Sequence, residues 1–99
     1  MSEAQRRMSE ADRLNDLVGR KVVLDTDSFH LYVGTLVSVD DCFYELADAD
    51  VHDVTSTSTP RDLYIINVRK FGVKKNRDRV LVRRSRVVSV SPLDDVTEY

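Results

Sequence analysis

The 99-residue sequence has a single cysteine, Cys42, no tryptophan and only two histidines. One cysteine excludes an intramolecular disulfide and favours a reducing compartment. A zinc site with four cysteine or histidine ligands has no basis in this composition. No run approaches the ~20 consecutive apolar residues that cross a bilayer, and residues 1–7 are too polar for a secretory signal. We therefore expect a protein of the cytoplasm, or of the nucleus in a eukaryote, without a membrane partner.

The motifs of common enzymes are also missing. There is no glycine-rich phosphate loop, and residues 56–59 lack both a Ser-His-Asp context and a glycine elbow. The acidic cluster of Asp48, Asp50 and Asp53 is more typical of solvated charge than of a cation site. The sequence predicts a protein that is not an enzyme and has no metal, cofactor or small-molecule substrate.

What the sequence does contain is an uneven distribution of charge. Residues 1–60 carry a net charge of −7, residues 61–86 carry +8, and residues 87–99 carry −3. A basic block in an acidic protein is compatible with binding nucleic acid phosphates. It is equally compatible with contact to the acidic block of a neighbouring subunit. The charge pattern alone leaves both interpretations open.

The length predicts one small domain, with apolar residues making up 41% of the chain. Ala4, Met8, Ala11 and Leu14 recur at three- and four-residue steps, which predicts a helix over about 3–18, capped by Ser2. Strand-like segments follow at residues 21–25, 29–39 and 42–49. An interior glycine at position 34 marks a bulge, a bend or a close backbone approach in the second strand.

An insertion over about 51–77 separates the third strand from the last two. The residues around its start, 50–59, are polar and predict a loop. Thr59 as a cap, Pro60 at the first helical position and Gly72 beyond a basic end favour a short helix over 59–71. We expect Leu63, Ile66, Asn67 and Lys70 to share one face of this helix. Lys74, Lys75 and Arg77 then form a basic loop, a secondary candidate patch for RNA.

The segment 80–90 is the most distinctive part of the chain. It predicts two valine-rich strands, at about 79–83 and 86–91, joined by a corner too tight for an ordinary hairpin loop. Arg83, Arg84 and Arg86 lie within four positions at this corner, so we expect them to require an anion. The partner is either a nucleic acid or a carboxylate of the same or an adjacent subunit, with Asp40, Asp41 and Glu45 as the candidate carboxylates. An acidic tail at 94–99 closes the chain.

This order of elements resembles the Sm/LSm family. Residues 17–22, Leu-Val-Gly-Arg-Lys-Val, and residues 33–40, Val-Gly-Thr-Leu-Val-Ser-Val-Asp, fit the first Sm motif. Residues 82–90, Val-Arg-Arg-Ser-Arg-Val-Val-Ser-Val, fit the second motif except that Arg84 replaces its glycine. Both motifs stand in the family's order behind an amphipathic helix.

The resemblance implies a mainly β fold, a small strongly bent five-stranded barrel over about 20–91 with an N-terminal helix. It also implies a homo-oligomeric ring, in which the fourth strand of one subunit pairs with the fifth of the next, and binding of single-stranded RNA through the loops at the pore. By position, Cys42 falls at the family's base-stacking residue and Tyr44 at its asparagine, so the resemblance at these two positions does not imply uridine-specific recognition. The candidate RNA-binding residues are Asp40, Cys42, Tyr44, Arg83, Arg84, Ser85 and Arg86.

Two alternatives stay open. One is an oligomeric scaffold that keeps the Sm fold for protein interaction and has lost base recognition. The other is a monomeric barrel of the ribosome-maturation (PRC-like) type, which residues 17–23 also resemble, although the cationic corner does not.

Overall fold

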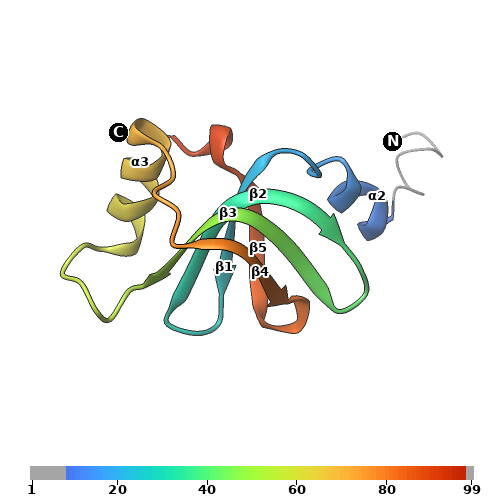
Figure 1. The fold of residues 1–99 in the computed structure, drawn as a ribbon, viewed down its shortest axis with the longest axis horizontal. Coiled ribbons are helices and arrows are strands. Elements are labelled where there is room, and N and C mark those ends of the chain that lie inside the picture. Colours follow the sequence, from blue (N-terminus) through green and yellow to red (C-terminus); the bar gives the residue numbers. More distant parts are fainter. Residues whose placement is uncertain (1–8, 98–99) are drawn as a thin grey trace.

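The computed structural model describes residues 9–97 of the chain and confirms the predicted mainly β fold. A helix precedes three strands, a second helix separates the third strand from the fourth, and a short 3₁₀ turn joins the fourth to the fifth (Figure 1). The elements are α2 (Glu10–Asn15), β1 (Lys21–Thr26), β2 (His30–Val39), β3 (Phe43–Asp53), α3 (Arg61–Phe71), β4 (Arg77–Arg83), η1 (Arg84–Arg86), β5 (Val87–Pro92) and η2 (Leu93–Asp95).

The five strands form one sheet in the order β4-β3-β2-β1-β5, and every neighbouring pair is antiparallel. The two strands that flank the arginine corner, β4 and β5, are therefore the two edges of the sheet. Figure 1 shows β2 and β3 curving together across the molecule. Their pairing shifts register twice, between Val33 and Thr35 and between Leu36 and Ser38, which gives the sheet its bend.

Gly34 lies at the first of these shifts. Val33 pairs with Asp50 and Thr35 with Ala47, so β3 has one more residue than β2 here, and Asp48 takes a positive φ of 49°. A Cβ at position 34 would lie 3.0 Å from the Ala47 carbonyl oxygen and 3.0 Å from the Ala49 Cβ. Of the alternatives that the sequence left open at this glycine, the structure shows both an irregularity in strand pairing and a close backbone approach.

Apolar side chains inside the bend form the main core. Leu14 of α2 closes one end of it, and half-buried Val80, Val87 and Val90 from the edge strands pack around it. Its buried members are Leu14, Val22, Leu24, Leu36, Tyr44, Leu46, Ala49 and Val82.

A second cluster covers the opposite face of β1 and β2. Val23 belongs to it, whereas Val22 and Leu24 on either side belong to the main core, because successive side chains of a strand point to opposite faces. Helix α3 and η2 supply the cover, and Figure 1 places α3 at the opposite end of the molecule from α2. The buried members are Val23, Leu31, Val33, Tyr64, Val68 and Leu93.

The predicted insertion helix is confirmed as α3, but its predicted cap was wrong. Its N-cap is Pro60 and no side chain caps it, so Thr59 does not act as the cap. The sequence left open which face of the helix is buried. In the structure Tyr64 and Val68 pack against the apolar surface of β1 and β2, and Leu63 is 48% exposed. Gly72 ends the helix as predicted, with φ of 91° and its N–H donating to the Val68 carbonyl at 2.9 Å.

Several boundaries also differ from the prediction. Ser9 caps the helix that begins at Glu10 through a reciprocal capping box with Asp12, and the helix ends at Asn15 rather than at position 18. Ser2 and residues 3–8 of the predicted helix lie outside the described residues. Strand β3 continues to Asp53 into the predicted loop because β2 pairs with it as far as His30. No helix within residues 9–97 is long and apolar enough to cross a membrane.

The close approach at Gly34 predicts that Gly34→Ala destabilises the protein. A new methyl group would press on a backbone carbonyl that cannot move cheaply, at a cost of about 1–3 kcal/mol. If the neighbouring strand yielded, alanine would instead stabilise the chain by about 0.4–1 kcal/mol through the unfolded state. Urea unfolding measures the sign, and Ser38→Ala at an exposed position of β2 is the control. An unchanged or raised free energy of unfolding would contradict the close approach.

Candidate nucleic-acid interface

The fold brings the two sequence motifs together at one end of the sheet. The loop at residues 40–42 joins β2 to β3, and β3 pairs with β4 so that Phe43 lies opposite Arg83 and Tyr44 opposite Val82. The Arg84 N–H donates to the Cys42 carbonyl at 2.8 Å. The candidate residues from the loop and from the corner are therefore neighbours in space, although about 40 positions separate them in the sequence.

Asp40 holds its own loop in shape. Its Oδ1 accepts the backbone N–H groups of Cys42 and Phe43, each at 2.7 Å. These two hydrogen bonds, that from Cys42 foremost, hold the pKa of the Asp40 carboxyl below its usual value. The carboxylate is thus occupied by main-chain donors of the loop, which assigns Asp40 a structural role within the subunit.

Two of the three corner arginines already have carboxylate partners. Arg84 donates to Glu10 Oε1 at 2.8 Å and to the Asp40 carbonyl at 2.6 Å, and its guanidinium lies 5.8 Å from the Tyr44 ring centre. Arg86 pairs with Asp27 at 2.8 Å. Within residues 9–97 the carboxylates paired with these two arginines are therefore Glu10 and Asp27, and Asp40, Asp41 and Glu45 of the same subunit form no ion pair with them.

Arg83 differs from the other two. Its guanidinium lies 5.3 Å from the centre of the Phe43 ring, and within residues 9–97 it has no carboxylate partner. Both side chains are on the outer side of the β3–β4 pair, since their strand neighbours Tyr44 and Val82 are buried in the core. The structure thus presents an aromatic ring and an unneutralised cation together at the surface.

Tyr44, one of the candidate RNA-binding residues, cannot stack on a base in this conformation. It is 5% exposed and belongs to the main core. Cys42 is exposed but has no ring. Phe43, which is not among the candidate residues named from the sequence, is half-buried at the surface. The alternation of side chains along a strand could have identified Phe43 from the sequence. If Tyr44 points into the core, its neighbour Phe43 must point outward.

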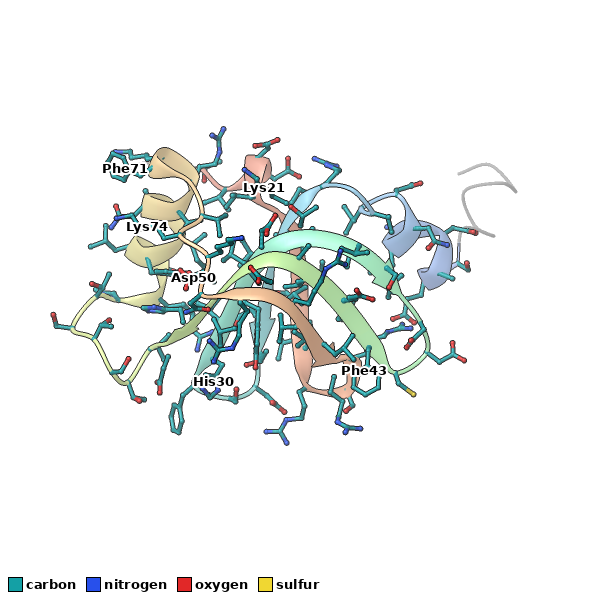
Figure 2. All side chains as sticks on the ribbon, viewed as in Figure 1. Lys21, His30, Phe43, Asp50, Phe71 and Lys74 are labelled. Atoms are coloured by element: carbon teal, nitrogen blue, oxygen red, sulfur yellow. The ribbon has the colours of Figure 1, made fainter. Side chains whose placement is uncertain are left out.

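The remaining candidate residues are split between the two ends of β4. Ser85 lies with the corner in η1, whereas Lys74, Lys75 and Arg77 lie where the chain enters β4. Figure 2 shows Lys74 beside α3, far from Phe43 at the corner. Lys75 pairs with Asp78 at 3.0 Å and Asp48 at 3.3 Å. The secondary patch is therefore separate from the corner.

Other polar side chains near α3 serve packing. Tyr64 Oη donates to Asp50 Oδ2 at 2.6 Å, and the ring stacks on His52 with centroids 3.8 Å apart. Burial, with the hydrogen bond to Asp50, raises the pKa of Tyr64 well above its ordinary value. No group of three potential metal ligands is found in the part of the chain that the structure describes.

The lowered pKa of Asp40 predicts a pH-dependent effect of Asp40→Asn. The carboxylate favours the folded state above the unfolded pKa of about 3.9, and this contribution is lost as pH falls through the lower folded pKa. The difference in unfolding free energy between wild type and Asp40→Asn should be largest near neutrality and should shrink below about pH 4. Denaturant unfolding across pH measures it, with Asp41→Asn as the adjacent control. A difference that does not change with pH would contradict this role.

Comparison with solved structures identifies the architecture. No protein-family model and no curated protein matches the sequence. The chain is similar to an Sm protein of Pyrococcus abyssii, solved in complex with a uridine heptamer, at 19% identity and a TM-score of 0.59, covering 85% of this chain and 97% of the other. It is also similar to an Sm-like protein of Archaeoglobus fulgidus, at 16% identity and a TM-score of 0.58, covering 85% of this chain and 93% of the other.

A heptameric archaeal Sm protein matches at 28% identity and a TM-score of 0.54, covering 81% of this chain and 94% of the other. The two motifs that suggested this architecture occupy the expected strands, and the helix between β3 and β4 lengthens the connection that the sequence marked as an insertion. The chain has an Sm-like fold with a strongly diverged sequence.

Proposed function

We propose that this protein forms a homo-oligomeric Sm-like ring that binds single-stranded RNA with little discrimination between bases. The observation that carries the RNA-binding part is the pairing of exposed Arg83 with Phe43, at the corner where the two motifs meet. The protein acts by binding, not by catalysis.

The sheet edges support the ring. Strands β4 and β5 are both edge strands, each with a row of backbone groups that the subunit's own sheet does not pair. Leu81 on β4 is 59% exposed and Val88 on β5 is 71% exposed. Pairing β4 of one copy with β5 of the next would bury both strands, and repeating this head-to-tail contact closes a ring. One of the similar solved proteins is described as heptameric.

We predict that at micromolar concentration the protein has the mass of a ring of about five to seven copies. Native mass spectrometry measures it. Leu81→Lys should reduce the mass to that of a folded monomer, because the charge would lie in the strand-to-strand contact. Val18→Lys, at an exposed apolar position outside both edge strands, should leave the ring intact. A strictly monomeric wild type would contradict the proposal and favour the monomeric small-barrel alternative.

The corner supports RNA as the ligand of the ring. One of the similar proteins was solved with a uridine heptamer. In a closed ring, the corner of each subunit would contribute one unneutralised guanidinium to the same region, which attracts a chain of phosphates. Tyr44 is buried and Cys42 has no ring, so Phe43 is the side chain of this loop region on which a base could stack. Every base has a stacking face, so this contact would discriminate little between bases.

Arg83→Ala should weaken RNA binding uniformly across sequences, because the guanidinium meets phosphate rather than a base edge. The slope of log affinity against log salt should fall by about 1 for each phosphate that the variant no longer neutralises. Fluorescence anisotropy with uridine and adenosine oligomers at several salt concentrations measures both effects. Arg79→Ala is the matched control on the same strand, because its guanidinium is already paired with Glu45 at 2.9 Å. A strong preference of the wild type for uridine would contradict the loss of base discrimination.

A scaffold without RNA is the second candidate. It is favoured by the pairing of Arg84 and Arg86 with Glu10 and Asp27, which leaves one unneutralised arginine at each corner. An intact ring with no measurable affinity for RNA at low salt would support this candidate and exclude the first.

A further inference from the structure

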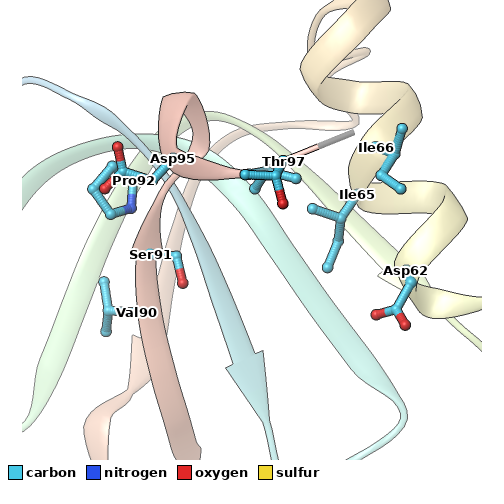
Figure 3. A pocket seen from close by; sticks show the side chains of 9 residues that line it. Asp62, Ile65, Ile66, Val90, Ser91, Pro92, Asp95 and Thr97 are labelled. Carbon is cyan, nitrogen blue, oxygen red and sulfur yellow. The ribbon is translucent and has the colours of Figure 1, made fainter. Parts of the chain in front are cut away.

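A groove runs between α3 and the end of β5 (Figure 3). It has a volume of about 530 Å³. Its walls combine apolar side chains with two carboxylates, from Ile65, Ile66, Pro92, Val96, Asp62 and Asp95. The groove adjoins an edge strand, so it lies where another chain that pairs with β5 would pass.

The carboxylates of this groove have no cationic partners within residues 9–97. Arg61, the cation next to Asp62 in the chain, instead pairs with Asp25. Asp62 and Asp95 are both exposed. An apolar groove with two unneutralised carboxylates fits an occupant with an apolar group and a positive charge.

An apolar group and a positive charge both occur in the segment that leads into β4, the strand at the opposite edge of the sheet from β5. Phe71 ends α3 and is 75% exposed, and Figure 2 shows it at the outer end of the helix. Lys74 follows three residues later, with no carboxylate partner in the described part of the chain. The segment 71–76 leads directly into β4, the strand that the proposed ring would pair with β5 of the next copy.

The direction of strand pairing brings the two features together. Every pair in the subunit's own sheet is antiparallel. An antiparallel pair between β4 and a neighbour's β5 sets Arg77, where β4 begins, near the neighbour's Pro92, where β5 ends. The segment before Arg77 is then carried to the neighbour's groove.

We propose that the groove between α3 and β5 of one copy receives Phe71 and Lys74 of the next copy. The proposal rests on the ring described above and assigns its insertion helix a role in assembly. Phe71 would fill the apolar part of the groove, and Lys74 would face Asp62 and Asp95. Because one chain supplies both halves, the contact favours identical neighbours over other Sm-like subunits that lack the insertion.

Phe71→Ala tests the apolar half of the contact. We expect the concentration at which half the rings dissociate to rise roughly tenfold, since truncation of a buried aromatic anchor is among the largest interface effects. Phe29→Ala is the matched control, because Phe29 is 65% exposed at the turn between β1 and β2. Mass photometry of diluted rings measures both variants, and circular dichroism verifies that each is folded.

Charge exchange tests the other half. Lys74→Glu and Asp95→Lys should each weaken the ring, and the double variant Lys74→Glu/Asp95→Lys should recover at least part of the loss. Arg13→Glu, on α2 at the opposite end of the molecule, makes the same charge change as Lys74→Glu and should have no effect on assembly.

The outcomes separate this contact from the ring itself. A wild type that never forms rings overturns both proposals. Rings that form normally but dissociate at the same concentration in wild type, Phe71→Ala and Lys74→Glu overturn the groove contact alone. A loss in Phe71→Ala with recovery in the charge-exchanged double variant supports both.

Discussion

The close approach of β2 and β3 at Gly34 is the constraint on which the remaining structure depends. Because no side chain separates the strands there, the sheet bends enough to enclose a core with few large residues and no tryptophan. The antiparallel pairing of β3 with β4 then brings the loop at 40–42 and the turn at 84–86 to one end of the molecule. The position of the candidate interface therefore follows from backbone pairing within the sheet and not from any charged side chain.

Much of the fold could be predicted because its signals are local. Each signal marks one structural feature. The bend of the sheet lies at Gly34, the end of α3 lies at Gly72, and the turn between β4 and β5 follows Val82 and Arg83. The buried face of α3 could not be predicted in this way. Its side chains offer more than one apolar stripe, and the choice of Tyr64 and Val68 depends on the surface of β1 and β2.

The candidate site was predictable in position but not in chemistry. The motifs place Arg83, Arg84 and Arg86 together, and the structure keeps them together. Which of them is neutralised depends on Glu10 and Asp27, which reach the corner from other parts of the chain. Sequence spacing has no information on such long-range ion pairs, so it cannot distinguish three similar arginines, of which only Arg83 lacks a carboxylate partner within residues 9–97.

The burial of β1 and β2 on both faces has an evolutionary consequence. Val23, Leu31 and Val33 are compatible with water-free packing only while α3 and η2 cover them. A descendant that shortened the insertion to a simple loop would expose this apolar surface to water. A descendant that first made these positions polar would remove the surface against which α3 packs. Each change alone would remove one side of the same apolar contact, so we expect the helix and the three aliphatic residues to be inherited or lost together.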